Sequence, residues 1–412
     1  MSTTLLANFE FHCYGCDESA AVEPRGAACG HCGEPLSLRF SGKDAPTCLD
    51  SPPESLWHYR EFLPVADRDS IVSLGEGATR LVEAPRLAAK FGFEQLLLKN
   101  ETSNPTGSFK DRQVSVGISH ARELGMDTVA VVSSGNVACA AAAYAARAGM
   151  RAVLFMHGMA APGKIAQAAA YGAKVLCVNS PSAGAVFELC VAACERFGWY
   201  HLSTSGMHEP YNVEGAKTIA YELFHQCGGD VPDWIVTPVG GGGLLGGIWR
   251  GVLDLKRAGV LNRIPRLAGV QAAGCAPVKQ AIDKGTPFLE TLKSPWPNPK
   301  TIAGGIADDI IFDGHTVLPA IRTTDGLAPV VTDDEIIAGE LLLASTEGIL
   351  CEPSCAVVVA ALNQIPRNGR DTRVCCVITG TGIKDLDAIR NQVAPPARIA
   401  PTLEAVDQEM NS

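Results

Sequence analysis

Short apolar runs alternate with longer stretches of helical spacing along most of this chain. The runs are typical of buried strands, and the stretches between them are typical of helices. The runs lie at residues 95–99, 128–132, 152–155, 174–178, 234–239, 267–271 and 374–379. This order predicts an α/β fold with mostly parallel sheets covered by helices on both faces. Ligands of such sheets bind beyond the carboxyl ends of the strands, so we expect chemistry in the loops after the runs.

Two predicted helices have recognisable starts. Thr332 and Glu335 form a capping box, and from Ser108 onward the apolar spacing predicts a helix opened by a hydroxyl cap. Lys110 then lies in the first turn, where the helix dipole and a dry pocket would both disfavour a charged ammonium. Such a lysine is a candidate nucleophile, although a solvated surface lysine is the ordinary alternative.

Length and charge narrow the classes of function. A chain of 412 residues suits two or three domains, and a net charge of −10 argues against a nucleic-acid partner. The N-terminus lacks the features of a secretory signal, and no uncharged apolar run reaches the ~20 residues that span a bilayer. We therefore expect a cytoplasmic protein without membrane contact, whose 15 cysteines are mostly reduced thiols with some reserved for metal.

Four of the cysteines form two Cys-x-x-Cys knuckles, Cys13 with Cys16 and Cys29 with Cys32. The loop between the knuckles is long enough for a β-hairpin, so four thiolates can converge tetrahedrally on one zinc ion. Four sulfur ligands leave no open position for water, which predicts a structural zinc ribbon. The alternative is four unconnected buried cysteines. Metal binding would supply much of the folding free energy of so small a segment.

Two loops after predicted strands can bind anions. The loop of Ser133, Ser134, Gly135 and Asn136 opens an alanine-rich helix, and its N–H groups and hydroxyls suit a carboxylate. An ordinary helix cap is the alternative. The second loop carries four successive glycines, through which main-chain N–H groups can approach an anion closely. These glycines are Gly240, Gly241, Gly242 and Gly243. A dinucleotide site is the alternative, but these glycines do not form a Gly-x-Gly-x-x-Gly site in a first βαβ unit.

The string Asn104-Pro-Thr-Gly-Ser-Phe-Lys-Asp-Arg112 resembles the cofactor-lysine segment of threonine synthases, which are fold type II enzymes with the tryptophan-synthase-like fold. The resemblance extends from Cys13 to Asp385. It implies that Lys110 holds pyridoxal 5′-phosphate as a Schiff base and that Asn136 donates to the 3′-oxygen. It further implies that Gly240–Gly243 with Leu244 bind the cofactor phosphate, and that Thr379 contacts the pyridine nitrogen.

The same resemblance implies substrate-binding residues. Thr79 lies in a Gly-Glu-Gly-x-Thr segment, and Lys164 in a Gly-Lys-x-Ala-Gln segment, like those of the family; the loop Ser133, Ser134 and Gly135 would take the substrate carboxylate. Three features depart from the family. Arg80 replaces a proline, Gly241 and Leu244 look more like serine or threonine dehydratases, and the run 304–309 is unlike that of most threonine synthases. These departures put the substrate in question, whereas Thr379 favours threonine synthase over dehydratases.

We therefore predict two three-layer αβα domains with mostly parallel sheets, plus an N-terminal zinc ribbon. The ranges are 1–40 for the ribbon, 41–72 for a linker with a short helix, 73–100 with 213–395 for a large cofactor-binding domain, and 101–212 for a smaller domain with Lys110 near the cleft.

The predicted function is a pyridoxal-phosphate-dependent lyase or synthase acting on an amino acid, a small-molecule substrate. The first choice is conversion of O-phospho-L-homoserine and water to L-threonine and phosphate. The runner-up is β-elimination or β-replacement, as in threonine or serine dehydratases and cysteate synthases. A non-catalytic zinc-ribbon binding protein is a third reading, against which Lys110, Asn136, the glycine loop and Thr379 together argue. A homodimer is expected from the resemblance.

Overall fold

The computed structural model describes residues 8–23, 26–42, 46–157, 162–180, 183–367, 372–390, 392–393 and 395–411. Within these residues the strands form three sheets. A small antiparallel sheet contains β1 (Phe9–His12), β2 (Ser19–Ala20) and β3 (Ser37–Phe40). A four-stranded parallel sheet contains β6 (Thr128–Val132), β7 (Arg151–His157), β8 (Lys174–Val178) and β9 (Tyr200–His201), in the order β8-β7-β6-β9.

The largest of these sheets has six strands. They are β4 (Leu81–Glu83), β5 (Gln95–Asn100), β10 (Trp234–Pro238), β11 (Arg266–Ala272), β12 (Val330–Val331) and β13 (Arg373–Ile378). The order is β12-β11-β10-β13-β5-β4, and only the edge strand β4 runs antiparallel to its neighbour. All seven apolar runs predicted from the sequence are strands, which confirms the predicted fold class.

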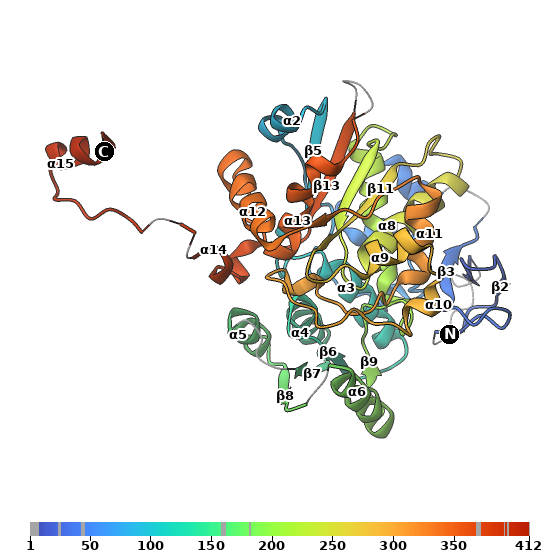
Figure 1. The fold of residues 1–412 in the computed structure, drawn as a ribbon. Helices are drawn as coiled ribbons and strands as arrows, with labels where there is room; N and C mark the ends of the chain where they lie inside the picture. The colour runs from blue at the N-terminus through green and yellow to red at the C-terminus, as the bar shows by residue number, and fades with distance from the viewer. Residues whose placement is uncertain are drawn as a thin grey trace.

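The four-stranded sheet is covered on both faces, and with its helices it forms the small lobe (Figure 1). The helices are α3 (Lys110–Glu123), α4 (Asn136–Ala148), α5 (Pro162–Ala170) and α6 (Ala183–Phe197). Val129 and Val131 of β6 pack on the side of α3 and α4, whereas Ala130 packs on the side of α6. Alternate residues of one strand thus fill two separate cores, as the period of two in a strand requires.

The six-stranded sheet and its helices form the large lobe (Figure 1). Leu97 and Ile235 pack towards α7 (Thr218–Gln226), α8 (Gly243–Arg257) and α11 (Gly314–Thr323), and Leu96 and Val236 pack towards the opposite layer. That layer contains α2 (Pro85–Phe91), α12 (Asp333–Glu347) and α13 (Pro353–Ala360). The short helices α9 (Pro277–Lys284) and α10 (Phe288–Thr291) lie beside α11.

Helix starts agree only in part with the sequence. The capping box of Thr332 and Glu335 at α12 is confirmed. The predicted hydroxyl cap of α3 is wrong, because Phe109 occupies the cap position without a side-chain hydrogen bond. Ser108 instead pairs with Gly380 through the backbone, and its buried Oγ has no hydrogen-bond partner among the described residues. Lys110 still begins the helix.

The N-terminal sheet packs on the large lobe. The ring centroids of Tyr14 and Trp249 lie 4.7 Å apart, and Oγ of Ser37 lies 3.2 Å from Nε2 of His315. The following segment contains 3-10 turns at η1 (Thr47–Asp50), η2 (Leu56–Phe62) and η3 (Arg68–Ser70), so the predicted short helix is a 3-10 segment. The three sheets lie inside the predicted ranges 1–40, 73–100 with 213–395, and 101–212, while the boundaries themselves stay predictions.

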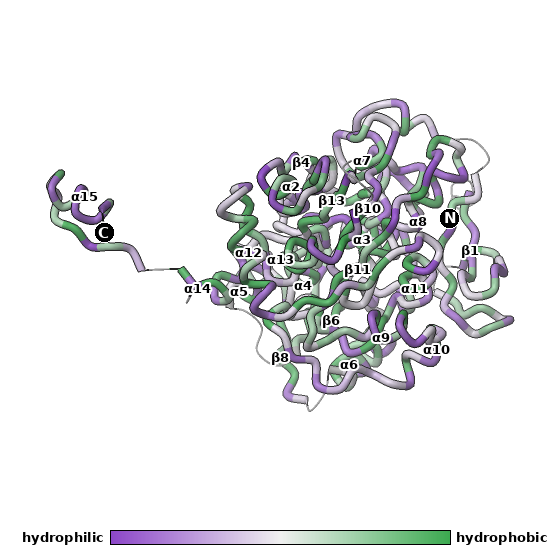
Figure 2. The backbone as a smooth tube through the Cα atoms, turned by 45° about the horizontal axis from the view of Figure 1, so that its top comes forward, coloured by the Kyte–Doolittle hydropathy of each residue, from purple (hydrophilic) through white to green (hydrophobic). Residues whose placement is uncertain are grey.

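The C-terminal segment carries α14 (Asp387–Arg390) and ends in α15 (Leu403–Met410), which lies apart from the body of the molecule (Figure 1). Figure 2 shows hydrophobic and hydrophilic residues alternating along this segment. Leu403 is 80% exposed and Met410 is 78% exposed. None of the described helices is long and apolar enough to cross a membrane.

A fully buried ion cluster ties α3 to the large lobe. Nε of Arg112 donates to Glu101 at 2.7 Å, and its Nη1 donates to Glu222 at 2.6 Å. Glu222 also accepts from Nζ of Lys99 at 2.5 Å. The side chains of all four residues are 0% exposed, so strand β5, the turn after it, α3 and α7 are joined at one point. Two cations against two carboxylates leave the buried cluster close to neutral.

Removing the guanidinium of Arg112 should therefore destabilise the protein strongly. Arg112→Met leaves Glu101 and Glu222 with only one of their two counter-charges, and we expect the free energy of unfolding to fall by about 3–5 kcal/mol. Urea unfolding followed by circular dichroism measures the loss. Arg151→Met is the matched control, because Arg151 pairs with Asp127 on the surface and its loss should leave stability nearly unchanged. Equal losses in both variants would contradict the importance of the buried cluster.

Candidate active site

The structure brings Lys110 and the glycine turn together. Nζ of Lys110 donates to Oε1 of Gln113 at 3.1 Å. Nε2 of the same Gln113 lies 3.1 Å from the position that a Cβ on Gly243 would take. One side chain therefore spans the gap between the amine and a turn that lies far away in the sequence. Gln113 follows Lys110 by three residues in α3, and residues at this spacing are neighbours on one face of a helix.

The amine of Lys110 has an altered acidity. Burial lowers the pKa of Lys110 to about 8, and the carboxylates of Asp308 and Asp313 oppose that shift. Burial also raises the pKa of Asp313 to about 7, and it raises the pKa of Asp308. A lysine with a pKa near 8 is partly neutral at physiological pH, so it can act as a nucleophile or accept a proton.

The four-glycine turn fits a phosphate group. A Cβ on Gly240 would lie 2.5 Å from Oδ2 of Asp308, and one on Gly242 would lie 2.5 Å from Cγ2 of Val317. Gly242 also has a φ of 104°, which other residues rarely adopt. Only glycine leaves room here, so main-chain N–H groups at the start of α8 can approach an anion. Nε2 of Gln113, a buried donor without a hydrogen-bond partner among the described residues, lies beside the turn. These groups suit a ligand that carries both a phosphate and an amine-reactive carbonyl.

Thr379 lies beside the lysine segment. Its carbonyl accepts the N–H of Phe109 at 2.9 Å, and the N–H of Thr381 donates to the carbonyl of Gly107 at 3.0 Å. The end of β13 therefore holds the turn that precedes Lys110 by backbone hydrogen bonds. This arrangement follows from the fold, because β13 is a central strand and its carboxyl end opens at the same edge as β10 and the glycine turn.

Asn136 lies in a cluster of charged side chains. Its Nδ2 donates to Oε2 of Glu352 at 2.6 Å, and its Oδ1 accepts from Nζ of Lys384 at 3.1 Å. Nζ of Lys164 lies 2.9 Å from Oε1 of Glu352 and 3.8 Å from Asp385. Burial lowers the pKa of Lys384. Hydrogen bonds to both its oxygen and its nitrogen thus orient the amide of Asn136. The amines of Lys164 and Lys384 both lie in this cluster.

The predicted substrate residues do not all lie together. Gly135 donates its N–H to Oγ of Ser133 at 3.1 Å, while Ser134 is exposed. Thr79 belongs to the buried ion cluster, where its Oγ1 donates to Glu101 at 2.6 Å and accepts from Arg112 at 3.1 Å. The structure does not bring Thr79 into the cluster of Asn136 and Lys164. The substrate roles of these residues stay predictions.

The four knuckle cysteines form a separate site. The Sγ atoms of Cys13, Cys16, Cys29 and Cys32 all lie within 4.8 Å of one another. Backbone N–H groups of Cys32 and His31 lower the pKa of Cys29 to about 6, whereas burial raises the pKa of Cys13. Each knuckle closes with a left-handed residue, Asp17 at φ 64° and Gly33 at φ 80°. This donor set fits a tetrahedral zinc ion.

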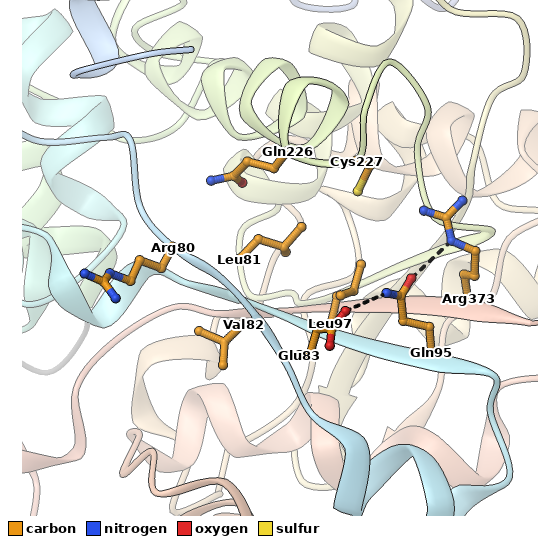
Figure 3. A pocket seen from close by; sticks show the side chains of 9 residues that line it. All are labelled: Arg80, Leu81, Val82, Glu83, Gln95, Leu97, Gln226, Cys227 and Arg373. Atoms are coloured by element: carbon orange, nitrogen blue, oxygen red, sulfur yellow. Dashed lines mark hydrogen bonds between the residues drawn. The ribbon is translucent and has the colours of Figure 1, made fainter.

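A cavity of about 790 Å³ lies elsewhere, along the edge strand β4 of the large sheet (Figure 3). Its floor carries a hydrogen-bonded chain from Arg373 through Gln95 to Glu83. None of the predicted site residues lines this cavity. Lys110, the glycine turn and Thr379 lie instead where ligands of parallel sheets bind, beyond the carboxyl ends of the strands.

Sequence reasoning did not include five residues of this site. The spacing of three residues from Lys110 could have pointed to Gln113. Lys384 follows Thr379 in the same loop, and Glu352 directly precedes helix α13. Asp308 lies in the run 304–309, which the sequence marks only as a departure from the family, and Asp313 carries no local signal. The five residues are Gln113, Asp308, Asp313, Glu352 and Lys384.

Comparison with known proteins identifies the family. Residues 72–380 match the family described as "Pyridoxal-phosphate dependent enzyme". A threonine synthase of Methanocaldococcus jannaschii is 38% identical over 348 residues, covering 84% of each chain, and one of Methanosarcina acetivorans is 39% identical over 356 residues, covering 85% of each. A solved threonine deaminase, from the organism abbreviated T.th., superposes with a TM-score of 0.61 at 27% identity, covering 73% of this chain and 92% of that chain. The chain therefore belongs to the threonine synthase family of pyridoxal-phosphate-dependent enzymes.

Proposed function

We propose that this enzyme converts O-phospho-L-homoserine and water to L-threonine and phosphate. The observation that carries the proposal is the approach of the Lys110 amine to the four-glycine turn through Gln113. This approach places an amine and an anion-binding turn together at the carboxyl ends of the strands, and pyridoxal 5′-phosphate requires both. The family relatives named threonine synthase support the choice of reaction.

Individual residues would hold the cofactor in defined ways. Lys110 would bind its aldehyde carbon, and Gly240–Gly243 with the N–H of Leu244 would bind its phosphate. Thr379 would contact the pyridine nitrogen through a neutral hydroxyl, and Asn136, fixed by Glu352 and Lys384, would orient the ring oxygen. When bound, the cofactor supplies an electron sink for negative charge that develops on the substrate.

Proton transfer falls to the amine of Lys110. With a pKa of about 8 it can take the proton from Cα of the substrate near neutral pH and return it elsewhere. The loop of Ser133, Ser134 and Gly135 would bind the substrate carboxylate. Lys164 would lie near the anionic end of the substrate, because its amine sits beside Asn136 and Glu352 at the same edge.

One observation favours a second candidate function. Asp308 and Asp313 place two carboxyl groups near the Lys110 amine, and in their ionised form these groups would repel a phosphorylated side chain. An uncharged hydroxy amino acid would meet no such repulsion. The second candidate is therefore β-elimination or β-replacement on a serine- or threonine-like substrate, with the same roles for Lys110 and the glycine turn.

We further propose that the four-cysteine cluster binds one structural zinc ion and that the protein works as a cytoplasmic homodimer without a nucleic-acid partner. The donor set of four sulfurs within 4.8 Å supports zinc. The packing of Tyr14 on Trp249 would let the ion brace the large lobe as well as the N-terminal sheet.

Lys110→Ala should remove the visible absorbance band of protein-bound pyridoxal phosphate and lower turnover by about 10²–10⁴-fold, because both the anchoring amine and the proton acceptor are lost. Lys174→Ala is the matched control, since Lys174 is exposed on β8. A retained band in the Lys110 variant, measured by absorbance after dialysis, would contradict the proposed anchor.

A panel of amino acids separates the two candidate reactions. The proposed reaction releases phosphate and threonine from O-phospho-L-homoserine in equal amounts, whereas β-elimination from serine or threonine yields a 2-oxo acid. We expect phosphate release as the dominant activity, measured with coupled colorimetric assays. Oxo acid from threonine without phosphate release from phosphohomoserine would replace the first candidate with the second.

Cys29→Ser should abolish zinc binding, because three sulfur ligands do not satisfy a closed tetrahedral site. We expect one zinc per chain in the unaltered protein and close to none in the variant, measured by elemental mass spectrometry after gel filtration. Cys177→Ser is the control, since Cys177 is an exposed thiol outside the cluster. Equal zinc content in both variants would exclude the cluster as the metal site.

A further inference from the structure

The carboxylate of Asp308 lies against the glycine turn. Its Oδ2 is 2.5 Å from the position of a Cβ on Gly240 and 3.4 Å from that of a Cβ on Gly241. The N–H of Gly241 and the amine of Lys110 both lie near enough to lower the pKa of this carboxyl, against the larger effect of burial. An acidic side chain of the protein therefore lies against the turn where the cofactor phosphate is proposed to bind, and its charge is favoured by Gly241 and Lys110 and opposed by burial.

The backbone fixes Asp308 in this place. Sγ of Cys275 donates to the carbonyl of Asp308 at 3.1 Å, and the N–H of Trp296 donates to the carbonyl of Asp309 at 2.7 Å. Both bonds hold the main chain of the segment 308–309 to residues outside the glycine turn. The carboxylate is thus presented to Gly240 and Gly241 by an anchored main chain, while rotation about the side-chain bonds of Asp308 remains available.

Asp313, the other nearby carboxyl, has a different role. Its N–H donates to the carbonyl of Gly241 at 2.7 Å, and its Oδ1 accepts the N–H of Gly206 at 2.6 Å. These two bonds join the glycine turn to α11 and to the small lobe, so Asp313 supports the shape of the turn. Oδ2 of Asp313 also borders the turn, 3.2 Å from the position of a Cβ on Gly243, but its carboxyl is held by Gly206. The carboxyl of Asp308 instead faces Gly240 and Gly241 and interacts with the N–H of Gly241.

The Asp308 carboxylate and a bound phosphate would need the same N–H groups of the glycine turn. The N–H groups of a glycine turn at a helix start attract negative charge, and either a carboxylate or a phosphate can satisfy them. Placed together on Gly240 and Gly241, a carboxylate and a phosphate would repel each other at contact distance. We propose that the Asp308 carboxylate is an internal competitor for the anion seat of the glycine turn, which must turn aside when a phosphate group binds there. The inference rests on the proposed cofactor site and adds a residue that sets how tightly the site holds phosphate.

Asp308→Asn tests the proposal, because the amide keeps the shape of the side chain and removes its charge. We expect inorganic phosphate to bind the full-length variant, freed of cofactor, about tenfold more tightly than the unaltered chain, measured by calorimetry. The variant should also bind pyridoxal phosphate more tightly, which a lower dissociation constant measured by visible absorbance would show. Asp308→Glu retains the charge and should bind phosphate no more tightly than the unaltered chain.

Asp309→Asn is the matched control, since Asp309 is an exposed carboxylate one residue further along. It should leave phosphate affinity within about twofold of the unaltered chain. Equal or weaker phosphate binding by a folded Asp308→Asn variant would overturn the proposal, as would equal gains in the Asp308 and Asp309 variants. Failure of every variant, and of the unaltered chain, to bind pyridoxal phosphate would instead refute the proposed function, so the two failures are distinguishable.

Discussion

The buried pairing of Arg112 with Glu101 and Glu222 is the constraint on which the site depends. Arg112 stands two residues after Lys110 at the start of α3, so the same turn that carries the reactive amine is tied to β5 and α7. Because neither partner has access to water, the pair has one favourable geometry and resists displacement. The backbone bonds from Phe109 and Gly107 to the end of β13 act on the other side of the turn. The turn that carries Lys110 is thereby tied to the large lobe on both sides.

Electrostatics then sets the chemistry of the held amine. Burial favours the neutral form of Lys110, while Asp308 and Asp313 favour the charged form, and the balance leaves the pKa at about 8. The same two carboxyl groups border the glycine turn, where the cofactor phosphate is proposed to bind. In the proposed site, the N–H groups of the glycine turn would attract phosphate, whereas ionised Asp308 and Asp313 would repel it. The same two carboxyl groups would therefore affect the pKa of Lys110, the affinity for the cofactor and the choice between phosphorylated and uncharged substrates.

Much of this arrangement could be predicted from the sequence. The parallel strands were visible as apolar runs, and the glycine turn, Lys110 and the cysteine knuckles were visible as local patterns. The hydroxyl cap at Ser108 was wrong because backbone pairing of Ser108 with Gly380, across about 270 residues of chain, replaced a local interaction. Asp308 and Asp313 were missed for a related reason. Their approach to Lys110 is a product of tertiary packing of the segment before α11, which has no periodic pattern of its own.

One particular amine, that of Lys110, is proposed to anchor the cofactor. Reduction of the pyridoxal-phosphate-loaded protein with borohydride, followed by proteolysis and mass spectrometry of the peptides, tests it directly. Lys164 and Lys384 lie in the neighbouring cluster with Asn136 and are internal competitors for the label. We expect the pyridoxyl mass increment on Lys110 in near-stoichiometric amount. An increment carried mainly by Lys164, Lys384 or another lysine would contradict it.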